Sequence, residues 1–396
     1  MKRWIVLAAG VILQTILGGV YAWSEFVPSL TSQYGLTNGQ CGMVFGVTIG
    51  VFTVTMILAG RLLKKVGPRV MAGIGAVLFA AGYVVASFSG GSFVGILAGI
   101  GVLTGAGIGA GYVCPLTVAM KWFPNNKGLV TGVAVAGFGG GAVLLSFLVQ
   151  YLLQTAGWGV LEVFRGVGLA FGAVAFVAAL LMSEPERKAE LADDELDLSE
   201  GIKTHALSGK FGFLFLGMFA GTFAGLLTVG NLKPILLNSG LSGSSATLGI
   251  AIFALGNAAG RIIWGQTHDR LGSRRTVVFS LAVLGAALAP LMFDFSAGYM
   301  LTMVALVGIG FGACFVVYAS SMVEHFGVEL FPQLYPICFL GYGLAGIIGP
   351  GVGGWIEDTT GSFTPAIVLS VTIVFLATGA FAIGFPRVEA APATAE

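Results

Sequence analysis

Charge is scarce in this chain. Only 9% of its 396 residues are Asp, Glu, Lys or Arg, and they leave a formal net charge of +1. A chain with so little net charge is a poor candidate for binding nucleic acid. There are just four cysteines, none with CxxC spacing and all in apolar runs: Cys41, Cys114, Cys314 and Cys338. We therefore expect small packing residues and no disulfide, metal site or other cofactor.

Apolar residues, by contrast, make up 56% of the chain. That composition indicates a polytopic membrane protein. A helix needs about 20 apolar residues to cross a bilayer, and these runs are too long and too uniformly apolar for barrel strands. We predict an all-α membrane protein with twelve spans, at residues 4–30, 39–62, 70–88, 92–121, 127–153, 161–183, 211–236, 245–267, 275–293, 297–323, 332–356 and 363–385.

Lysine and arginine gather in alternate loops, which predicts the orientation of the chain. By the positive-inside rule both termini should be cytoplasmic. We expect the protein to lie in the plasma (inner) membrane. The one long polar segment divides the chain. We expect an N-terminal six-helix bundle at 1–183, a cytoplasmic linker at 184–210, a C-terminal six-helix bundle at 211–387 and a disordered tail at 388–396.

The two halves repeat each other. Gly60-x3-Lys64-x2-Gly67-x-Arg69 matches Gly265-x3-Asp269-x2-Gly272-x-Arg274, each after the second span of its half. Three glycines of the fourth span match three of the tenth, and Phe138 of the fifth span then corresponds to Tyr342 of the eleventh. Such duplicated units place a substrate site at their interface near the membrane midplane, with access alternating as the halves rock.

Arg261 is the residue on which the functional interpretation depends, because it lies within the apolar eighth span. A charge at membrane depth is costly and normally faces a cavity or pairs with an acid. Every Asp and Glu lies in a loop, a helix end, the linker or the tail, except Glu25 near the outer end of the first span. A guanidinium keeps its charge and fits a carboxylate with two parallel hydrogen bonds. We therefore expect Arg261 to bind the carboxylate of a carried anion; the alternative is an internal ion pair.

Other polar side chains could complete such a site. Asn257 lies four residues before Arg261 on the same helix face, where it could bind a substrate oxygen or a neighbouring backbone group. Four tyrosines lie on spans expected to line the cavity, with bundle packing as the alternative: Tyr21, Tyr112, Tyr318 and Tyr342.

Glu25 is a candidate for proton coupling, because a partly buried carboxylate takes up a proton more readily; the alternative is a residue that reaches the outer interface. Lys233 is interpreted as an interfacial anchor, with attraction of an anion as the alternative. The three histidines fall on cytoplasmic segments, which argues against a histidine proton relay within the membrane. Four charges of the loop after the eighth span should form an inner gate: Asp269, Arg270, Arg274 and Arg275.

The chain resembles the oxalate/formate antiporter family of the major facilitator superfamily. The resemblance rests on GGVYAWS (18–24), KWFPNNKGLVTGVAVAGFGGGA (121–142), GNAAGRIIWG (256–265) and FLGYGLAGIIGP (339–350). It implies that Arg261 binds the substrate carboxylate and that Tyr21, Tyr112 and, in place of a tyrosine, Phe138 line the site. The oxalate carriers have a lysine where this chain has Tyr342. One fixed positive charge fits a monocarboxylate better than a dianion.

Together these features predict a proton-coupled symporter of L-lactate or pyruvate, working by alternating access as a monomer in the bilayer. Anion exchange of formate- or oxalate-type carboxylates is the alternative within transport. A membrane enzyme is disfavoured, because the spans lack paired carboxylates or a nucleophile with its base. A sensor is disfavoured too, since neither linker nor tail has room for a signalling domain.

Overall fold

The computed structural model describes residues 2–123, 127–185 and 205–386, and nearly all of them are helical. The expected linker at 184–210 and tail at 388–396 therefore lie largely outside the described residues. The N-terminal half contains α1 (Lys2–Gly18), η1 (Gly19–Glu25), α2 (Val27–Tyr34), α3 (Asn38–Val66), α4 (Pro68–Ser87), α5 (Phe93–Ile96), η2 (Leu97–Thr104), α6 (Gly105–Trp122), α7 (Lys127–Gln154) and α8 (Val160–Leu180).

The C-terminal half contains α10 (Gly209–Gly230), α11 (Leu232–Asn238), α12 (Gly243–Leu288), η3 (Ala289–Met292), α13 (Ala297–Thr360) and α14 (Thr364–Gly384). Both long helices are two helices joined at a sharp turn, at Gly272 in α12 and Gly327 in α13. Eleven helical stretches in the described ranges are long and apolar enough to cross a membrane, and one of them is the joined pair that meets at Gly272. The twelve predicted spans are thus confirmed.

The repeat is visible in the backbone. Gly67 and Gly272, the matching glycines of the two loop motifs, have φ values of 79° and 71°. Glycine is favoured there because a Cβ atom makes the left-handed region costly. The first helix of each half is also interrupted, by the 3₁₀ turn η1 in the N-terminal half and at Asn231 in the C-terminal half. The halves therefore share local irregularities as well as helix order.

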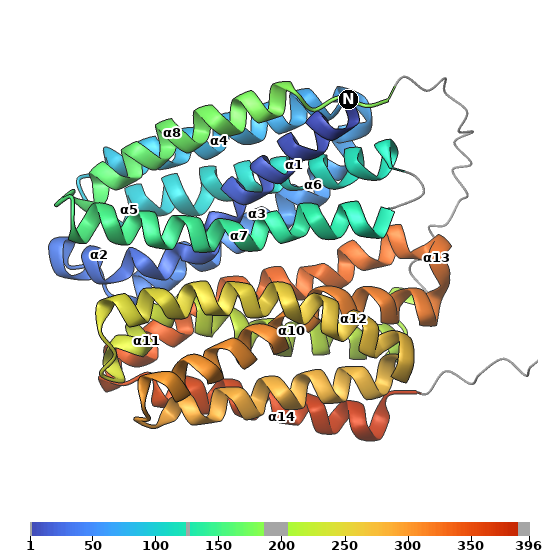
Figure 1. Cartoon of the computed structure of the whole chain (residues 1–396). Helices are drawn as coiled ribbons and strands as arrows, with labels where there is room; N and C mark the ends of the chain where they lie inside the picture. The colour runs from blue at the N-terminus through green and yellow to red at the C-terminus, as the bar shows by residue number, and fades with distance from the viewer. Residues whose placement is uncertain (1, 124–126, 186–204, 387–396) are drawn as a thin grey trace, which may run out of the picture.

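The two halves approach each other at one end and diverge at the other (Figure 1). We call the diverging end, next to residues 185 and 205, the linker side, and the opposite end, next to Tyr34 and Asn38, the distal side. At the distal side, the Asp358 carboxylate accepts from the backbone N–H groups of Asn38 and Gly39 at 2.8 and 2.7 Å. Within the described ranges, no hydrogen bond or ion pair joins the halves near the linker side. The molecule is therefore closed on its distal side.

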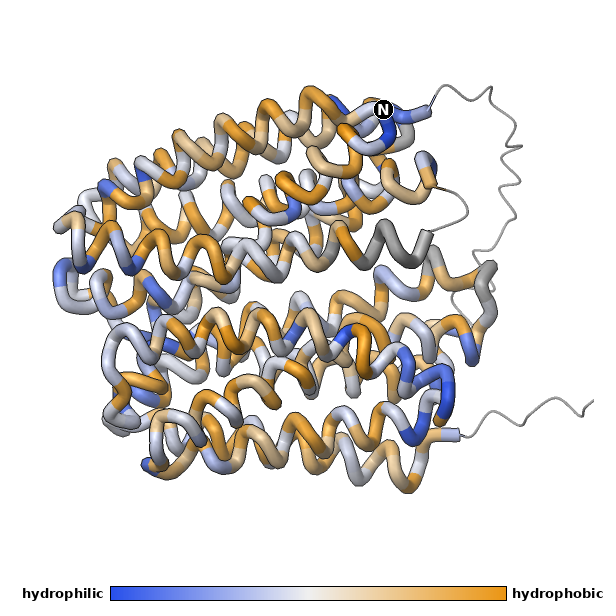
Figure 2. Tube along the Cα trace, viewed as in Figure 1, coloured by the Kyte–Doolittle hydropathy of each residue, from blue (hydrophilic) through white to orange (hydrophobic). Residues whose placement is uncertain are grey.

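Hydrophobic residues run along the length of the helices, and hydrophilic residues gather at the helix ends and turns (Figure 2). This distribution fits a bundle whose sides face lipid. All four cysteines are buried free thiols, so they pack as the sequence predicted.

Candidate functional site

Close helix packing fixes the backbone that carries Arg261. Gly256 and Gly260 of α12 face Gly308 and Gly312 of α13, and a Cβ atom at any of the four would collide with a carbonyl oxygen of the other helix. Small residues at this spacing let two helices pack backbone against backbone. The stretch that carries Asn257 and Arg261 is therefore held rigidly against the next membrane helix.

Arg261 is half-buried and has an aromatic neighbour instead of an acidic one. Its guanidinium carbon lies 4.5 Å from the centre of the Phe315 ring, a cation–π arrangement. Its Nε lies 3.5 Å from the Oδ1 atom of Asn257, a residue that is 2% exposed. Among the described side chains, none of the ion pairs includes Arg261. Its charge is therefore held in place without being neutralised.

The Phe315 ring connects Arg261 to an aromatic cluster shared by both halves. Its centre lies 5.5 Å from that of Tyr342, whose hydroxyl is 2.9 Å from the hydroxyl of Tyr21. Both tyrosines are buried. The Tyr21–Tyr342 hydrogen bond joins the first helix of the N-terminal half to the second part of α13, so these two predicted site residues do meet.

Two further predicted residues belong to the same cluster. The Phe138 ring lies 5.7 Å from Tyr21 and 5.3 Å from Tyr112, edge-on in both cases. Tyr318 lies elsewhere: it is 1% exposed and its hydroxyl points toward Gly217 of α10. The structure thus places Tyr21, Tyr112, Phe138 and Tyr342 together and Tyr318 apart from them.

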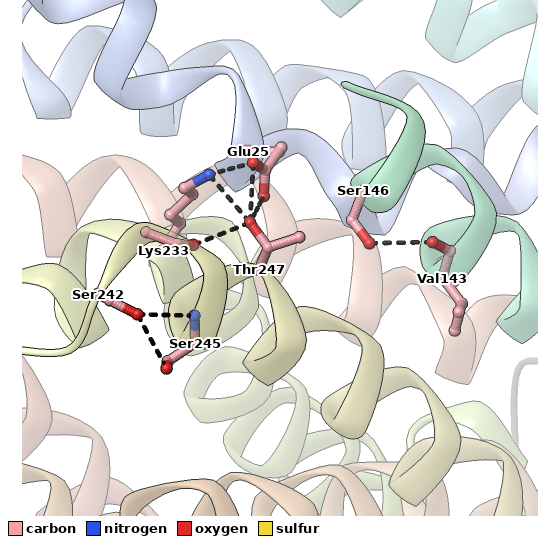
Figure 3. A network of polar contacts seen from close by, with 8 residues as sticks. Glu25, Val143, Ser146, Lys233, Ser242, Ser245 and Thr247 are labelled. Atoms are coloured by element: carbon pink, nitrogen blue, oxygen red, sulfur yellow. Dashed lines mark hydrogen bonds and ion pairs between the residues drawn. The ribbon is translucent and has the colours of Figure 1, made fainter. Parts of the chain in front are cut away.

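A second polar cluster lies closer to the distal side, and we call it the distal cluster. It consists of Glu25, Lys233 and Thr247 (Figure 3). Glu25, at the end of η1, forms an ion pair with Lys233 of α11. The Thr247 hydroxyl of α12 lies 3.0 and 2.9 Å from the two Glu25 carboxylate oxygens and accepts from Lys233 Nζ at 3.1 Å. The exposed fractions are 1% for Glu25, 5% for Lys233 and 0% for Thr247.

This cluster shows that the prediction for Lys233 was wrong, and it decides between the two predicted positions of the Glu25 side chain. Lys233 was expected to anchor the helix at the interface, and that was wrong: the side chain is buried and paired. The lysine turns inward, where the Glu25 carboxylate and the Thr247 hydroxyl bind its ammonium in place of interfacial water. Glu25 was predicted to be either a partly buried carboxylate or a residue that reaches the outer interface. Its side chain is buried, so only the first alternative agrees with the structure.

The charged turn around Gly272 interacts within its own half. Arg274 donates to the Ala382 carbonyl of α14. Glu324 accepts from the Ser273 backbone N–H at 3.1 Å, and its carboxylate lies 3.2 Å from His268. In the described part of the chain, Asp269, Arg270 and Arg275 form no ion pair. In this conformation the turn makes no polar contact with the N-terminal half among those residues.

Three participants were missed at the sequence level. Phe315 is one of 30 phenylalanines, and nothing distinguishes it until Arg261 is seen over its ring. The Thr247 hydroxyl also donates to the Gly243 carbonyl, as threonines within helices commonly do, so a threonine at this position does not by itself indicate a site. Tyr335, whose hydroxyl lies 3.4 Å from the Phe315 carbonyl, is the third. The one available signal was Lys233 itself, a lone lysine within an apolar run.

Comparison with known proteins identifies the family and the fold of the chain. The family profile described as Major Facilitator Superfamily matches residues 7–232 and 213–396, the whole chain apart from its first residues. A bacterial homologue of the human lysosomal transporter Spinster, solved in an inward-facing and unoccupied conformation, superposes with a TM-score of 0.78. At 16% identity, with 96% of each chain covered, this likeness shows the fold alone.

Three curated relatives cover most of the chain. The uncharacterized MFS-type transporter YhjX of Escherichia coli K12 is 26% identical over 347 residues, 87% of this chain and 86% of the relative. The oxalate:formate antiporter of Oxalobacter formigenes is 25% identical and covers 94% and 89%. Human monocarboxylate transporter 11 is 25% identical and covers 97% and 83%.

Proposed function

The chain belongs to the major facilitator superfamily, among transporters of the oxalate:formate antiporter and monocarboxylate transporter type, and we propose that it carries small monocarboxylates, L-lactate or pyruvate, together with protons. The observation that carries this proposal is Arg261. It is an arginine at membrane depth whose charge is unneutralised among the described residues, beside an aromatic cluster built by both halves. A substrate carboxylate would supply the missing partner.

The surroundings of Arg261 support one carboxylate and a small substrate. A guanidinium binds a carboxylate through two parallel hydrogen bonds, and Asn257 and the tyrosine hydroxyls could take a second oxygen. Tyr342 adds no charge where the oxalate carriers have a lysine, so a dianion would bring one negative charge without a partner. The rings of Phe138, Phe315 and Tyr112 would limit the size of the substrate.

We propose that the distal side is the outside and the linker side the cytoplasm, with both termini in the cytoplasm. The orientation follows from the lysines and arginines of the short linker-side loops. The conformation described here is then inward-facing. The proposed gate of Asp269, Arg270, Arg274 and Arg275 would be disengaged in this state and would meet the N-terminal half when the linker side closes.

Glu25 is the proposed proton-binding residue. Its carboxylate joins the two halves on the distal side through Lys233 and Thr247. Protonation would cancel the charge that holds Lys233, so taking up a proton from outside would favour opening. Glu25→Gln should therefore abolish the acceleration of L-lactate uptake by an inward proton gradient while exchange of L-lactate continues. An undiminished response to the gradient would show that the proton binds elsewhere.

Arg261→Gln tests the proposal as a whole. Truncating one partner of a buried charge pair costs about 2–5 kcal/mol, so uptake of labelled L-lactate should fall at least about thirtyfold. Arg261→Lys keeps the positive charge but cannot form two parallel hydrogen bonds with a carboxylate, so it should retain part of the activity. Elution as a single symmetrical species would show that both variants fold. Normal uptake by folded Arg261→Gln would refute the proposed site.

Exchange without net proton movement is the second candidate, favoured by the similarity to the oxalate:formate antiporter. It differs from symport in requiring an anion on the opposite side of the membrane. Uptake into vesicles with and without internal L-lactate or formate separates the two modes.

A further inference from the structure

The distal cluster contains a carboxylate-binding site that is occupied by the protein's own side chain. Lys233 and Thr247 both belong to the C-terminal half, and both direct their polar atoms at one carboxylate. That carboxylate, from Glu25, belongs to the N-terminal half (Figure 3). An ammonium and a hydroxyl that converge on a buried carboxylate are the same groups that a carboxylate substrate would require.

We propose that Lys233 and Thr247 form a second substrate subsite, which takes the carboxylate of an incoming monocarboxylate when the distal side is open. The inference rests on the proposed transport function. Opening separates the two halves and removes Glu25 from its partners. Lys233, which is 5% exposed in the closed form, then loses its anionic partner while Thr247 stays beside it on the same half. The carried anion is the candidate of matching chemistry.

The subsite lies on the same helix as Arg261. Thr247 precedes Arg261 by fourteen residues, which places it about 21 Å farther toward the distal side at 1.5 Å per residue. Asn257 lies between them on α12. A monocarboxylate could therefore bind first at Lys233 and Thr247 and then pass along α12 to Arg261.

Closure gives this passage a direction. When the halves come together again, the Glu25 carboxylate returns to Lys233 and Thr247 and excludes any substrate still bound there. Glu25 thus competes with the substrate for the subsite, and only its ionised form competes well. Protonation of Glu25 would leave the subsite available to the anion, which makes the subsite part of the proposed proton coupling.

The sharpest test compares the two partners of the ion pair. If the pair only holds the distal side closed, Glu25→Gln and Lys233→Gln break the same contact and should act alike. If Lys233 binds substrate, they should act in opposite directions. The readout is the external KM for labelled L-lactate in exchange mode, in right-side-out vesicles and without a proton gradient.

We expect Glu25→Gln to lower the external KM, because the competing carboxylate is gone. Lys233→Gln should raise it about tenfold or more, the value expected for losing a hydrogen bond to a charged group. Lys233→Arg should restore most of the affinity. The neutral double variant Glu25→Gln/Lys233→Gln leaves no unpaired buried charge and should still show the raised external KM, while the KM measured from the linker side should change little.

Arg165→Gln is the matched control. Arg165 is exposed near the distal end of α8, over the Phe88 ring, so its removal takes one positive charge from the same face outside the cluster. Its external KM should equal that of the wild type. Equal external KM values for Glu25→Gln and Lys233→Gln would overturn the subsite, provided that wild-type exchange is present and Arg261→Gln lacks it. Wild-type exchange that survives in Arg261→Gln would instead refute the proposed function.

Discussion

Removing the Asp358 carboxylate should open the distal side of the molecule. Asp358 accepts from the backbone N–H groups of Asn38 and Gly39 at the start of α3, and its neighbour Glu357 accepts from the Asn38 side chain at 2.6 Å. These bonds cross between the halves, so they exist only while the distal side is closed. A carboxylate at a helix N-terminus is further stabilised by the helix dipole.

The size of the effect follows from these contacts. Asp358→Asn can keep one weaker hydrogen bond but loses the charge, and exposure to solvent reduces what each bond contributes. A net loss of about 1–2 kcal/mol would shift the equilibrium toward the distal-open form by about five- to thirtyfold.

Distances between spin labels would measure this shift. Ser32 on α2 and Ser296 before α13 are exposed, lie near the distal side and belong to different halves. Labels placed there should show a larger population at long separation in Asp358→Asn than in the wild type. Asp294→Asn removes an exposed acid from the same face and should change nothing. Equal distributions in all three proteins would refute the assignment of Asp358 to the distal closure.

Further outcomes follow from single contacts. Tyr342→Phe removes the partner of the Tyr21 hydroxyl and should also favour the distal-open form, by about fivefold for a bond of about 1 kcal/mol; unchanged spin-label distances would contradict this. Tyr342→Lys should move substrate preference from L-lactate toward oxalate in competition assays, because it adds the second positive charge; an unchanged profile would count against the argument from charge. A Cβ atom at Gly42 would overlap the Pro350 carbonyl, so Gly42→Ala should impair distal closure. Gly60 lies on the same helix with open space beside it, so Gly60→Ala should not. The same spin labels should show longer separations in Gly42→Ala than in Gly60→Ala, and equal distances would contradict this.

Much of the architecture was predictable because membrane helices leave a direct record in the sequence. The twelve apolar runs correspond to observed helices, and the repeated motif places Gly67 and Gly272 at equivalent turns. Arg261 could be singled out because a charge is rare within such runs. Its relation to Asn257 followed from the four-residue helix spacing, and the structure places the two side chains next to each other.

Contacts between distant segments were not predictable in the same way. Glu25 and Lys233 are 208 residues apart, and each alone is equally compatible with an interfacial position. Aromatic residues posed the opposite difficulty: Phe315 and Tyr318 differ by three positions, yet Phe315 lies under Arg261 and Tyr318 packs toward α10. Which aromatic ring faces the site depends on how helices rotate against each other, and periodicity within one apolar helix does not determine that rotation.

Proton-coupled transport can be measured as the accumulation of labelled L-lactate in proteoliposomes that have an inward proton gradient and no internal anion. We expect the wild-type protein to concentrate L-lactate above its external level until the gradient is dissipated, and Arg261→Gln to show no such accumulation. Uptake that ignores the gradient and appears only when an anion is loaded inside would contradict proton-coupled carriage and establish exchange in its place.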